Sequence, residues 1–545
     1  MSRRSKIVFY KHVSVANPNS SDAGSKTGVA TRALLLLLLL ITPHLHAQIE
    51  AAPIVPNRFI VVYRNAAIPG DAEARIHAAG ANLLHRNERF GIATVQTTAN
   101  SSPVRAHSIS SAQSDAETMR RLAASPNVDY VLHDRIVTAH RLTLRPVAPA
   151  TFSVIIGSTT QTKNYDSYYN SPQGWAVQQI GGYGNNVPGG PAHGPWDTTM
   201  GKGVRIAILD SGVDETHPDL SPNLALNISE INQTDYPSPC DDGTPQDQEG
   251  HGTWTASLAA GAVGPGSGKI VGVAPAATLL NIKVLQRMPD TSVGSGASTA
   301  DQCTTGQASG LLSWVMQGID DAVTNHADII SLSVGVTVDL TTGEGAGLKA
   351  AFDQITAAAA QAGIVIVASA GNDGLNLTNP NYAELPAQSS GVLAIVASTN
   401  PACAQNTAAG ATCTPGPTAL AYYSNYGAPL NALAAPGGSY PEGGDLAVSG
   451  WVRGACSSGK PSTLDGPPSD SSHSFGCFNF GHTAYVQAIG TSASAPLAAG
   501  AAALLRAAHP DWTATTIIST LRATAVASPA LPVPQINAAA ALAAH

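Results

Sequence analysis

Short, nearly continuous apolar runs recur along the chain, each bounded by glycine, proline or polar residues. Three of them lie in its middle part, at 203–209, 327–335 and 364–370. Strands that are buried on both faces have this composition, which is typical of parallel sheets covered by helices. Two stretches rich in small residues, 254–260 and 497–508, have the character of helices. The pattern predicts an α/β fold, with a mostly parallel sheet flanked by helices, over residues 166–545.

A smaller unit is predicted before this domain, over residues 52–140. Three apolar runs in it are typical of strands, at 57–64, 90–95 and 128–131. Residues 116–124 have helical spacing, and a second helical stretch follows the first run. The order strand, helix, strand, helix, strand predicts a small α/β domain of ferredoxin-like type. Residues 141–165 have little pattern, and we predict a linker with a processing site between about Ala139 and Tyr165.

The first 47 residues have the pattern of a secretory signal peptide. Arg32 precedes an unbroken leucine run at 34–40, and residues 45–47 offer a small-residue cleavage site. The run is shorter than the roughly 20 residues that a membrane-spanning helix needs, so we expect no membrane contact of the mature form. A buried core helix is the alternative, although the run has no amphipathic period. The signal predicts a secreted protein, either extracellular or periplasmic.

The composition excludes some classes of protein but does not identify the function. Hydrophobic residues make up 43% of the 545 residues and charged residues only 12%, which predicts a compact globular protein and argues against disorder. The formal net charge of −8 provides no basic face for nucleic acid. We therefore expect no nucleic-acid partner.

The six cysteines are expected to form disulfides, because an even count in an exported protein favours bridges over metal binding. No two of them have the C-x-x-C spacing of a zinc site. Six cysteines allow 15 connectivities, of which we favour pairing between neighbours in the sequence. The candidate residues are Cys240, Cys303, Cys403, Cys413, Cys456 and Cys477.

Three short motifs carry candidate chemistry. Asp210 follows an apolar run within D-S-G, His251 stands in G-H-G-T, and Ser492 stands in G-T-S-A-S-A-P. Taken singly, each fits a turn residue or a helix cap. Together they have the order Asp, His, Ser, which is one of the known chain orders of a catalytic triad. A serine hydroxyl needs a neighbouring base, histidine can be that base, and a carboxylate can orient the imidazole.

These motifs resemble those of the subtilases, the subtilisin-like serine peptidases. The resemblance implies a subtilisin-like fold and an Asp210–His251–Ser492 triad that hydrolyses peptide bonds through an acyl-enzyme. It also implies that Asn372, in A-S-A-G-N, donates its amide to the oxyanion. The related sedolisins use a carboxylic acid as base and an aspartate as oxyanion donor, and His251 and Asn372 argue against them. No cofactor is expected for the chemistry.

The resemblance further implies where a polypeptide substrate binds. Ser333, Val334 and Gly335 would form one wall of the primary pocket, and Ala370 and Gly371 would form the other. An extended substrate would add to the enzyme as a strand. Val336 stands where the family often has a second glycine, which predicts altered access to the pocket.

A structural calcium ion is a further implication of the resemblance. Asp219, in His-Pro-Asp-Leu, matches a calcium ligand of the family, and Ca²⁺ favours oxygen donors. The partner loop at 264–270 lacks the usual asparagine, which counts against the site.

The segment 52–140 resembles the inhibitory propeptide of subtilases, through NRFIVVYR, FGIATV and SPNVDYVLHDRIV. The resemblance implies that this unit assists folding and inhibits the enzyme within the same chain. It predicts a monomeric precursor that processes itself. An esterase and a catalytically dead relative are the alternatives. The sequence around Ser492 lacks the G-x-S-x-G motif of many esterases, which argues against the first. The complete set of site residues argues against the second.

Overall fold

The computed structural model describes most of the chain from residue 52 onward, and the expected signal peptide lies outside the described residues. The described ranges are 52–98, 109–139, 143–146, 174–184, 193–263, 270–294, 296–304, 306–406, 413–440, 450–459 and 485–544. Within these ranges no helix has both the length and the apolar character needed to cross a membrane.

The N-terminal unit is a four-stranded antiparallel sheet with two helices. Its elements in chain order are β1 (Ile54–Tyr63), α1 (Ala72–Ala78), β2 (Ala81–Asn87), β3 (Ile92–Thr97), α2 (Ile109–Ala123) and β4 (Val128–Ala139), with the 3-10 turn Arg64–Ala66 after β1. The strand order β4-β1-β3-β2 is that of the expected ferredoxin-like fold. The sequence pattern missed β2, because its burial alternates irregularly and its polar residues resemble a loop.

The main sheet is mostly parallel, as the apolar runs predict. Its strands are β6 (Arg205–Asp210), β7 (Leu224–Ser229), β8 (Thr278–Lys283), β11 (Ile329–Leu332), β13 (Val365–Ser369), β15 (Val392–Thr399), β16 (Ala419–Leu420) and β17 (Leu433–Pro436). The order is β16-β15-β13-β11-β6-β8-β7, with β17 paired to β15, and only β16 runs antiparallel. The carboxyl ends of β6, β11 and β13 therefore meet at one edge, which is where open α/β sheets bind ligands.

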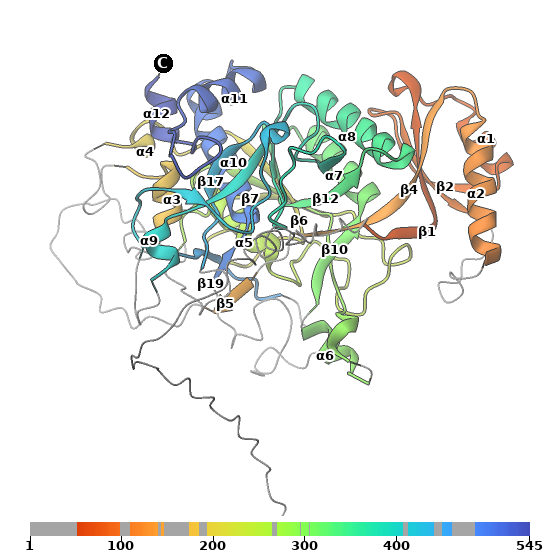
Figure 1. Cartoon of the computed structure of the whole chain (residues 1–545), viewed down its shortest axis with the longest axis horizontal. Coiled ribbons are helices and arrows are strands. Elements are labelled where there is room, and N and C mark those ends of the chain that lie inside the picture. The colour runs from red at the N-terminus through yellow and green to blue at the C-terminus, as the bar shows by residue number, and fades with distance from the viewer. Residues whose placement is uncertain are drawn as a thin grey trace, which may run out of the picture. The chain divides into compact units, whose positions relative to one another are not determined.

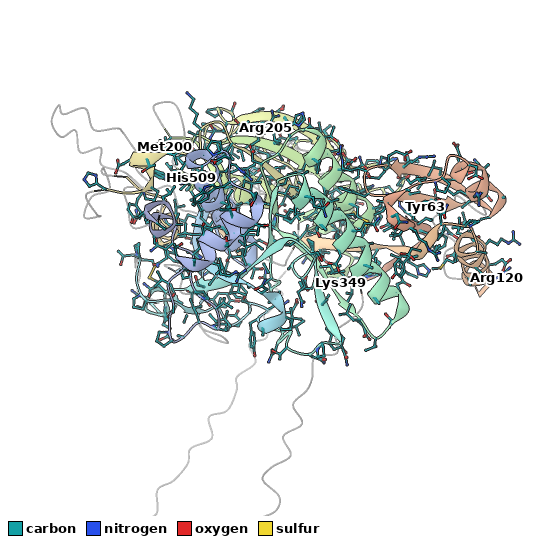
Figure 2. The ribbon with its side chains drawn as sticks, turned by 90° about the horizontal axis from the view of Figure 1, so that it is seen from above. Tyr63, Arg120, Met200, Arg205, Lys349 and His509 are labelled. Carbon is teal, nitrogen blue, oxygen red and sulfur yellow. A yellow bond between two sulfur atoms is a disulfide. The ribbon has the colours of Figure 1, made fainter. Side chains whose placement is uncertain are left out.

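Helices cover the faces of the main sheet (Figure 1). Those that contact its strands are α3 (Trp175–Ile180), α5 (His251–Ala260), α7 (Leu312–Thr324), α8 (Gly343–Gln361), α10 (Thr491–Ala508) and α11 (Ala514–Ala523). The shorter helices α4 (Pro195–Thr198), α6 (Thr299–Thr304), α9 (Pro401–Ala404) and α12 (Ala538–Ala543) and 3-10 turns at Thr291–Val293 and Ala428–Leu430 complete the described helical elements of this domain. Helix α10 packs on β11, β13, β15 and β17, and α7 and α8 pack against β4 of the N-terminal unit. Figure 2 shows the two parts side by side, with Tyr63 on the N-terminal unit and Lys349 on α8.

The remaining strands join segments that are distant in the sequence. They are β5 (Thr143–Pro146), β9 (Gln286–Met288), β10 (Gln307–Leu311), β12 (Val334–Asp339), β14 (Tyr382–Leu385), β18 (Val452–Ala455) and β19 (Tyr485–Ile489). Strands β9, β10, β12 and β14 extend the N-terminal sheet through β4, and β5 pairs with β19. The predicted linker 141–165 therefore contains a strand, because β19 offers a partner that the local sequence does not reveal. The predicted strand 327–335 is likewise divided at Ser333 into β11 and β12.

Candidate active site

Asp210 and His251 meet at the carboxyl edge of the main sheet. Asp210 is the last residue of β6, and His251 is the first residue of α5. Nδ1 of His251 lies 2.6 Å from Oδ1 of Asp210, and both side chains are buried. The contact fixes the orientation of the imidazole and leaves Nε2 on the opposite side of the ring. Nε2 is buried and has no hydrogen-bond partner among the described residues.

Two further groups hold the carboxylate of Asp210. The backbone N–H of Ser211 donates to Oδ1 at 2.7 Å, and the hydroxyl of Thr255 donates to Oδ2 at 3.1 Å. Thr255 stands four residues after His251 in α5, which brings both side chains to the same face of the helix. The carboxylate is thus fixed in place by its own loop and by the helix that carries the imidazole.

The environment of His251 raises its pKa. Burial acts to lower the pKa of the imidazole, but the charge and hydrogen bond of Asp210 outweigh it, with further help from the charges of Glu249 and Asp247. A base whose pKa is raised holds a transferred proton more readily, which suits an imidazole that accepts a proton from a serine hydroxyl.

A buried carboxylate, Asp247, organises the loop before α5. Its Oδ1 accepts hydrogen bonds from the hydroxyl of Ser211 at 3.0 Å and from the N–H groups of Glu249 and Gly250 at 3.0 and 2.8 Å. Its Oδ2 accepts from the N–H and the hydroxyl of Thr253 at 2.9 and 2.6 Å. Asp247 therefore ties the first turn of α5 to the residue that follows Asp210.

Ser492 lies in the first turn of α10, fully buried. Its hydroxyl contacts the carbonyl oxygen of Ser333 at 3.5 Å, and the hydroxyl of Ser333 donates to the carbonyl of Ser492 at 3.2 Å. The helix N-terminus provides a positive field for negative charge that develops at this position. The hydroxyl of Ser492 is directed at Ser333 and makes no hydrogen bond to Nε2 of His251, which has no partner among the described residues. Catalytic hydrogen bonds often tighten only with substrate bound.

Asn372 is fixed beside the first turn of α10. Its side-chain oxygen accepts hydrogen bonds from the N–H and the hydroxyl of Thr491 at 2.9 and 2.8 Å. Because the oxygen has this role, the amide nitrogen is directed to the other side. The preceding Gly371 has φ of +99°, and a Cβ there would lie 2.2 Å from the amide nitrogen of Asn425. Only glycine fits this turn without displacing its neighbours.

The two expected walls of the primary pocket lie at the ends of neighbouring strands. Strands β11 and β13 are paired in parallel with Leu332 opposite Ala368, so the residues that follow each strand leave the sheet at the same edge. Ser333 and Ala370 are buried there. The ends of these two strands are therefore neighbours at one edge of the sheet, and their role as walls of a substrate pocket stays a prediction.

Strand β4 of the N-terminal unit ends in this region between two strands of the main domain. Thr138 lies opposite Ser309 of β10 on one side and opposite Gly335 of β12 on the other. Ala139, the last residue of β4, lies opposite Val334. A few residues later, β5 pairs with β19, with Thr143 opposite Ile489. The chain is therefore paired with the main domain both before and after residues 140–142.

Polar contacts also join the N-terminal unit to α7. Asp134 is fully buried, and it accepts hydrogen bonds from the N–H and hydroxyl of Ser313 at 3.1 and 2.6 Å and from Arg58 at 2.8 Å. Ser313 belongs to the first turn of α7, whose N–H groups have no partners within the helix. Asp134 thus stabilises the start of this helix.

Comparison with known proteins identifies the family. The subtilase family model, Peptidase_S8, matches residues 201–539, which is more than half of the chain. This chain belongs to the subtilase family. It is therefore a subtilisin-like serine peptidase.

Two curated relatives illustrate the similarity of the subtilase to known proteins. It is 31% identical to subtilisin of Bacillus pumilus over 325 residues, which cover 60% of this chain and 84% of the relative. It is 27% identical to subtilisin-like protease 9 of Arthroderma otae over 406 residues, which cover 73% and 78% of the two chains.

Two solved structures support the subtilisin-like fold. Fervidolysin from Fervidobacterium pennivorans, described as a keratinolytic enzyme related to subtilisin, matches with a TM-score of 0.56 and 19% identity over 91% of this chain and 63% of its own. The epidermin leader peptide processing serine protease of Staphylococcus aureus matches with a TM-score of 0.57 and 18% identity, over 89% and 97% of the chains. At these identities the likeness concerns the fold.

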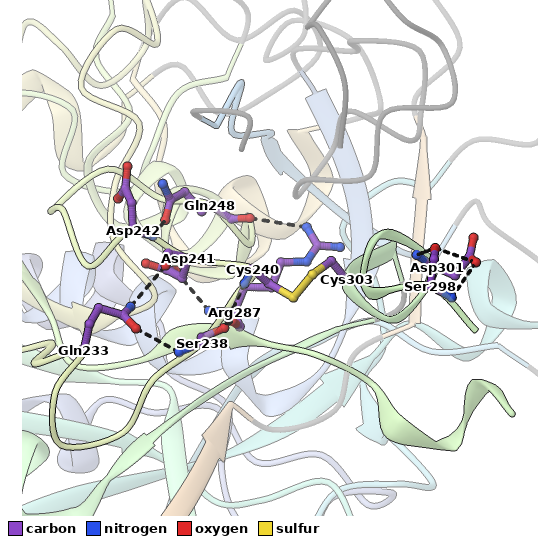
Figure 3. The surroundings of a disulfide bond; sticks show 10 residues. All are labelled: Gln233, Ser238, Cys240, Asp241, Asp242, Gln248, Arg287, Ser298, Asp301 and Cys303. Atoms are coloured by element: carbon purple, nitrogen blue, oxygen red, sulfur yellow. Dashed lines mark hydrogen bonds between the residues drawn. A yellow bond between two sulfur atoms is a disulfide. The ribbon is translucent and has the colours of Figure 1, made fainter. Parts of the chain in front are cut away.

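Two of the three expected disulfides are present in the subtilase. Cys240 bonds to Cys303 and Cys403 bonds to Cys413. Figure 3 shows the first bridge beside Arg287, whose guanidinium donates to the carbonyl of Gln248 at 3.3 Å. The bridge therefore supports the loop that leads to His251.

The third expected pair is tested only in part. Cys456 is disulfide-bonded, and Cys477 lies outside the described residues.

The calcium prediction at Asp219 remains a prediction. Asp219 is fully buried, and its Oδ2 accepts a hydrogen bond from the N–H of Ile270 at 3.0 Å. Most of the partner loop, 264–269, lies outside the described residues. Within the part of the subtilase that the structure describes, no group of three or more His, Cys, Asp or Glu could hold a metal ion.

Sequence reasoning missed two residues that position the site. Thr255 could have been found from its spacing of four residues from His251 on a predicted helix. Asp247 has no comparable signal, because its partners come from both sides of His251 and from the loop after β6.

Proposed function

We propose that the chain is a secreted serine endopeptidase made as a self-inhibited precursor. In this proposal Ser492 is the nucleophile, His251 the base and Asp210 the residue that orients it. The single observation that carries the proposal is the 2.6 Å contact between Nδ1 of His251 and Asp210. This contact leaves the buried Nε2 of His251 without a hydrogen-bond partner among the described residues, and α5, which carries His251, packs against α10, which carries Ser492.

The reaction follows from these positions. The hydroxyl oxygen of Ser492 attacks the peptide carbonyl carbon, and its proton passes to Nε2 of His251. The oxyanion accepts hydrogen bonds from the amide of Asn372 and from the N–H of Ser492. The C–N bond then breaks as His251 returns the proton to the amine. Water repeats these steps on the acyl-enzyme, which releases the carboxylic acid and restores the hydroxyl.

The proposed inhibitor is the N-terminal unit, residues 52–140. Its strand β4 lies between β10 and β12, where an extended substrate would bind by main-chain hydrogen bonds. The buried Asp134 and the capped start of α7 support a stable association of the two parts. Release of this unit would open the same strand edges to polypeptide substrates.

We propose that the precursor cleaves itself between Ala139 and Thr143. β4 pairs with the main domain up to Ala139, and β5 pairs with β19 from Thr143 onward. A substrate held on both sides of the scissile bond would be bound in the same way. This proposal narrows the processing site from the whole linker to four peptide bonds.

Export of the precursor is part of the proposal. The leucine run at 34–40 supports a signal peptide, and the disulfides support an oxidising compartment, either extracellular or periplasmic. The mature enzyme would act as a monomer without a catalytic cofactor.

The test compares the full-length protein with Ser492→Ala, both produced in a host that lacks other secreted proteases. We expect the wild type to lose its N-terminal unit and to degrade unfolded casein. The Ser492→Ala precursor should keep its full length and show no casein cleavage. Mass spectrometry of the wild type should place the new N-terminus within residues 140–143.

Three outcomes would each contradict part of the proposal. Casein cleavage by Ser492→Ala would exclude Ser492 as the nucleophile, and hydrolysis of a small ester without any cleavage of protein would indicate an esterase. Normal maturation of the Ser492→Ala precursor would refute self-processing while leaving the peptidase activity intact.

A further inference from the structure

A buried glutamate lies behind the proposed primary pocket. Glu384 belongs to β14, and its side chain is 1% exposed. A Cβ placed on Gly371 would lie 3.5 Å from its carboxyl carbon. The carboxylate therefore stands directly beside the wall formed by Ala370 and Gly371.

Glu384 also contacts strand β12, which begins at the opposite wall with Val334 and Gly335. Strand β12 pairs with both β4 and β14, and its residue Thr337 lies opposite Glu384 of β14. The hydroxyl of Thr337 donates to Oε2 of Glu384 at 2.6 Å, and Gln388 accepts a hydrogen bond from its N–H at 2.7 Å. The carboxylate thus lies between Thr337 of β12 and the turn at Gly371 that follows β13.

We propose that Glu384 makes this peptidase selective for arginine or lysine immediately before the scissile bond. The inference rests on the proposed function, because it concerns the substrate side chain that enters the same pocket. A carboxylate held in a water-excluded position interacts strongly with a cation and poorly with neutral or acidic groups. The planar guanidinium of arginine can meet both carboxylate oxygens at once.

The sequence of the precursor agrees with this preference. Ala139 is the last residue paired with β12, and the next two residues in the sequence are His140 and Arg141. The first substrate that the enzyme meets would therefore supply a basic side chain next to the proposed cleavage bonds.

The test uses the mature enzyme and quenched fluorescent peptides that differ only in the residue before the scissile bond. Arginine is compared with citrulline, its neutral near-isostere, and lysine with norleucine. We expect the wild type to cleave the arginine peptide with a kcat/KM at least about 30-fold higher than the citrulline peptide, in line with the cost of removing one partner of a buried ion pair. In Glu384→Gln the ratio should fall close to one, with little change for citrulline.

Two variants serve as controls. Glu384→Asp keeps the charge and should retain a preference for the cationic peptides. Glu215→Gln, at an exposed position where the carboxylate accepts a hydrogen bond from Asn227, should keep the wild-type ratio. Wild-type cleavage of arginine and citrulline peptides at equal rates would overturn the inference, as would an unchanged ratio in Glu384→Gln. Either result leaves casein cleavage in place and so differs from a failure of the proposed peptidase function.

Discussion

Asp247→Asn removes one charge and one acceptor from the loop that carries His251. The carboxylate accepts five hydrogen bonds, three at Oδ1 and two at Oδ2, and it is fully buried. The asparagine side chain has one acceptor oxygen in place of the two carboxylate oxygens, so it can replace only Oδ1 or Oδ2. In the less damaging orientation its nitrogen faces Thr253, so the N–H of Thr253 loses its acceptor.

The expected loss of stability follows from these changes in hydrogen bonding. A buried N–H without a partner costs about 1–3 kcal/mol, and the other donors lose the stronger attraction of a charged acceptor. Removal of a buried charge offsets part of the loss, since burial raises the pKa of Asp247 despite its hydrogen bonds. We expect the free energy of unfolding to fall by about 2 kcal/mol.

The same change should slow catalysis. The hydroxyl of Ser211 donates to Asp247 and accepts from the N–H of Gly252 at 2.9 Å, so the link between the Asp210 loop and α5 depends on it. A displacement of about 1 Å at a catalytic group can cost about 100-fold in rate. We expect kcat to fall by about 10- to 100-fold, with KM nearly unchanged.

The assay measures kcat on a peptide substrate after active-site titration, and the rate of thermal inactivation of the same sample. Asp353→Asn, which removes a partly exposed ion pair with Lys349 on α8, is the matched control and should change neither quantity appreciably. Wild-type kcat together with wild-type inactivation in Asp247→Asn would refute the reasoning.

Two other predictions concern the same region. Glu249→Gln removes a negative charge that helps to raise the pKa of His251, so the acidic limb of the profile of kcat/KM against pH should move to lower pH. An acidic limb at the wild-type pH would contradict this prediction. Glu215→Gln is the control. Replacement of both Cys240 and Cys303 by serine opens a crosslink with a sequence separation of 63 and should cost about 4 kcal/mol, measured as faster thermal inactivation without reductant. Inactivation at the wild-type rate would show that the bridge contributes little.

The sequence alone determined the main elements of the fold and the principal members of the candidate site. Continuous apolar runs predict β6, β11 and β13, because strands buried on both faces consist mostly of apolar residues. Asp210, His251 and Ser492 were recognisable as candidates because each stands in a short motif, at the end of a strand for Asp210 and at the start of a helix for the other two. The same local signals predicted Asn372.

Only the tertiary structure decided which distant groups meet. β5 has little strand character of its own, and it is a strand because β19 offers a partner. Asp247 and Glu384 look like ordinary acidic loop residues in the sequence, yet both are buried at the site. Their roles depend on contacts between elements far apart in the chain, and local sequence patterns do not predict such contacts. Local chemistry is therefore readable from sequence, whereas the support and selectivity of the site arise from packing.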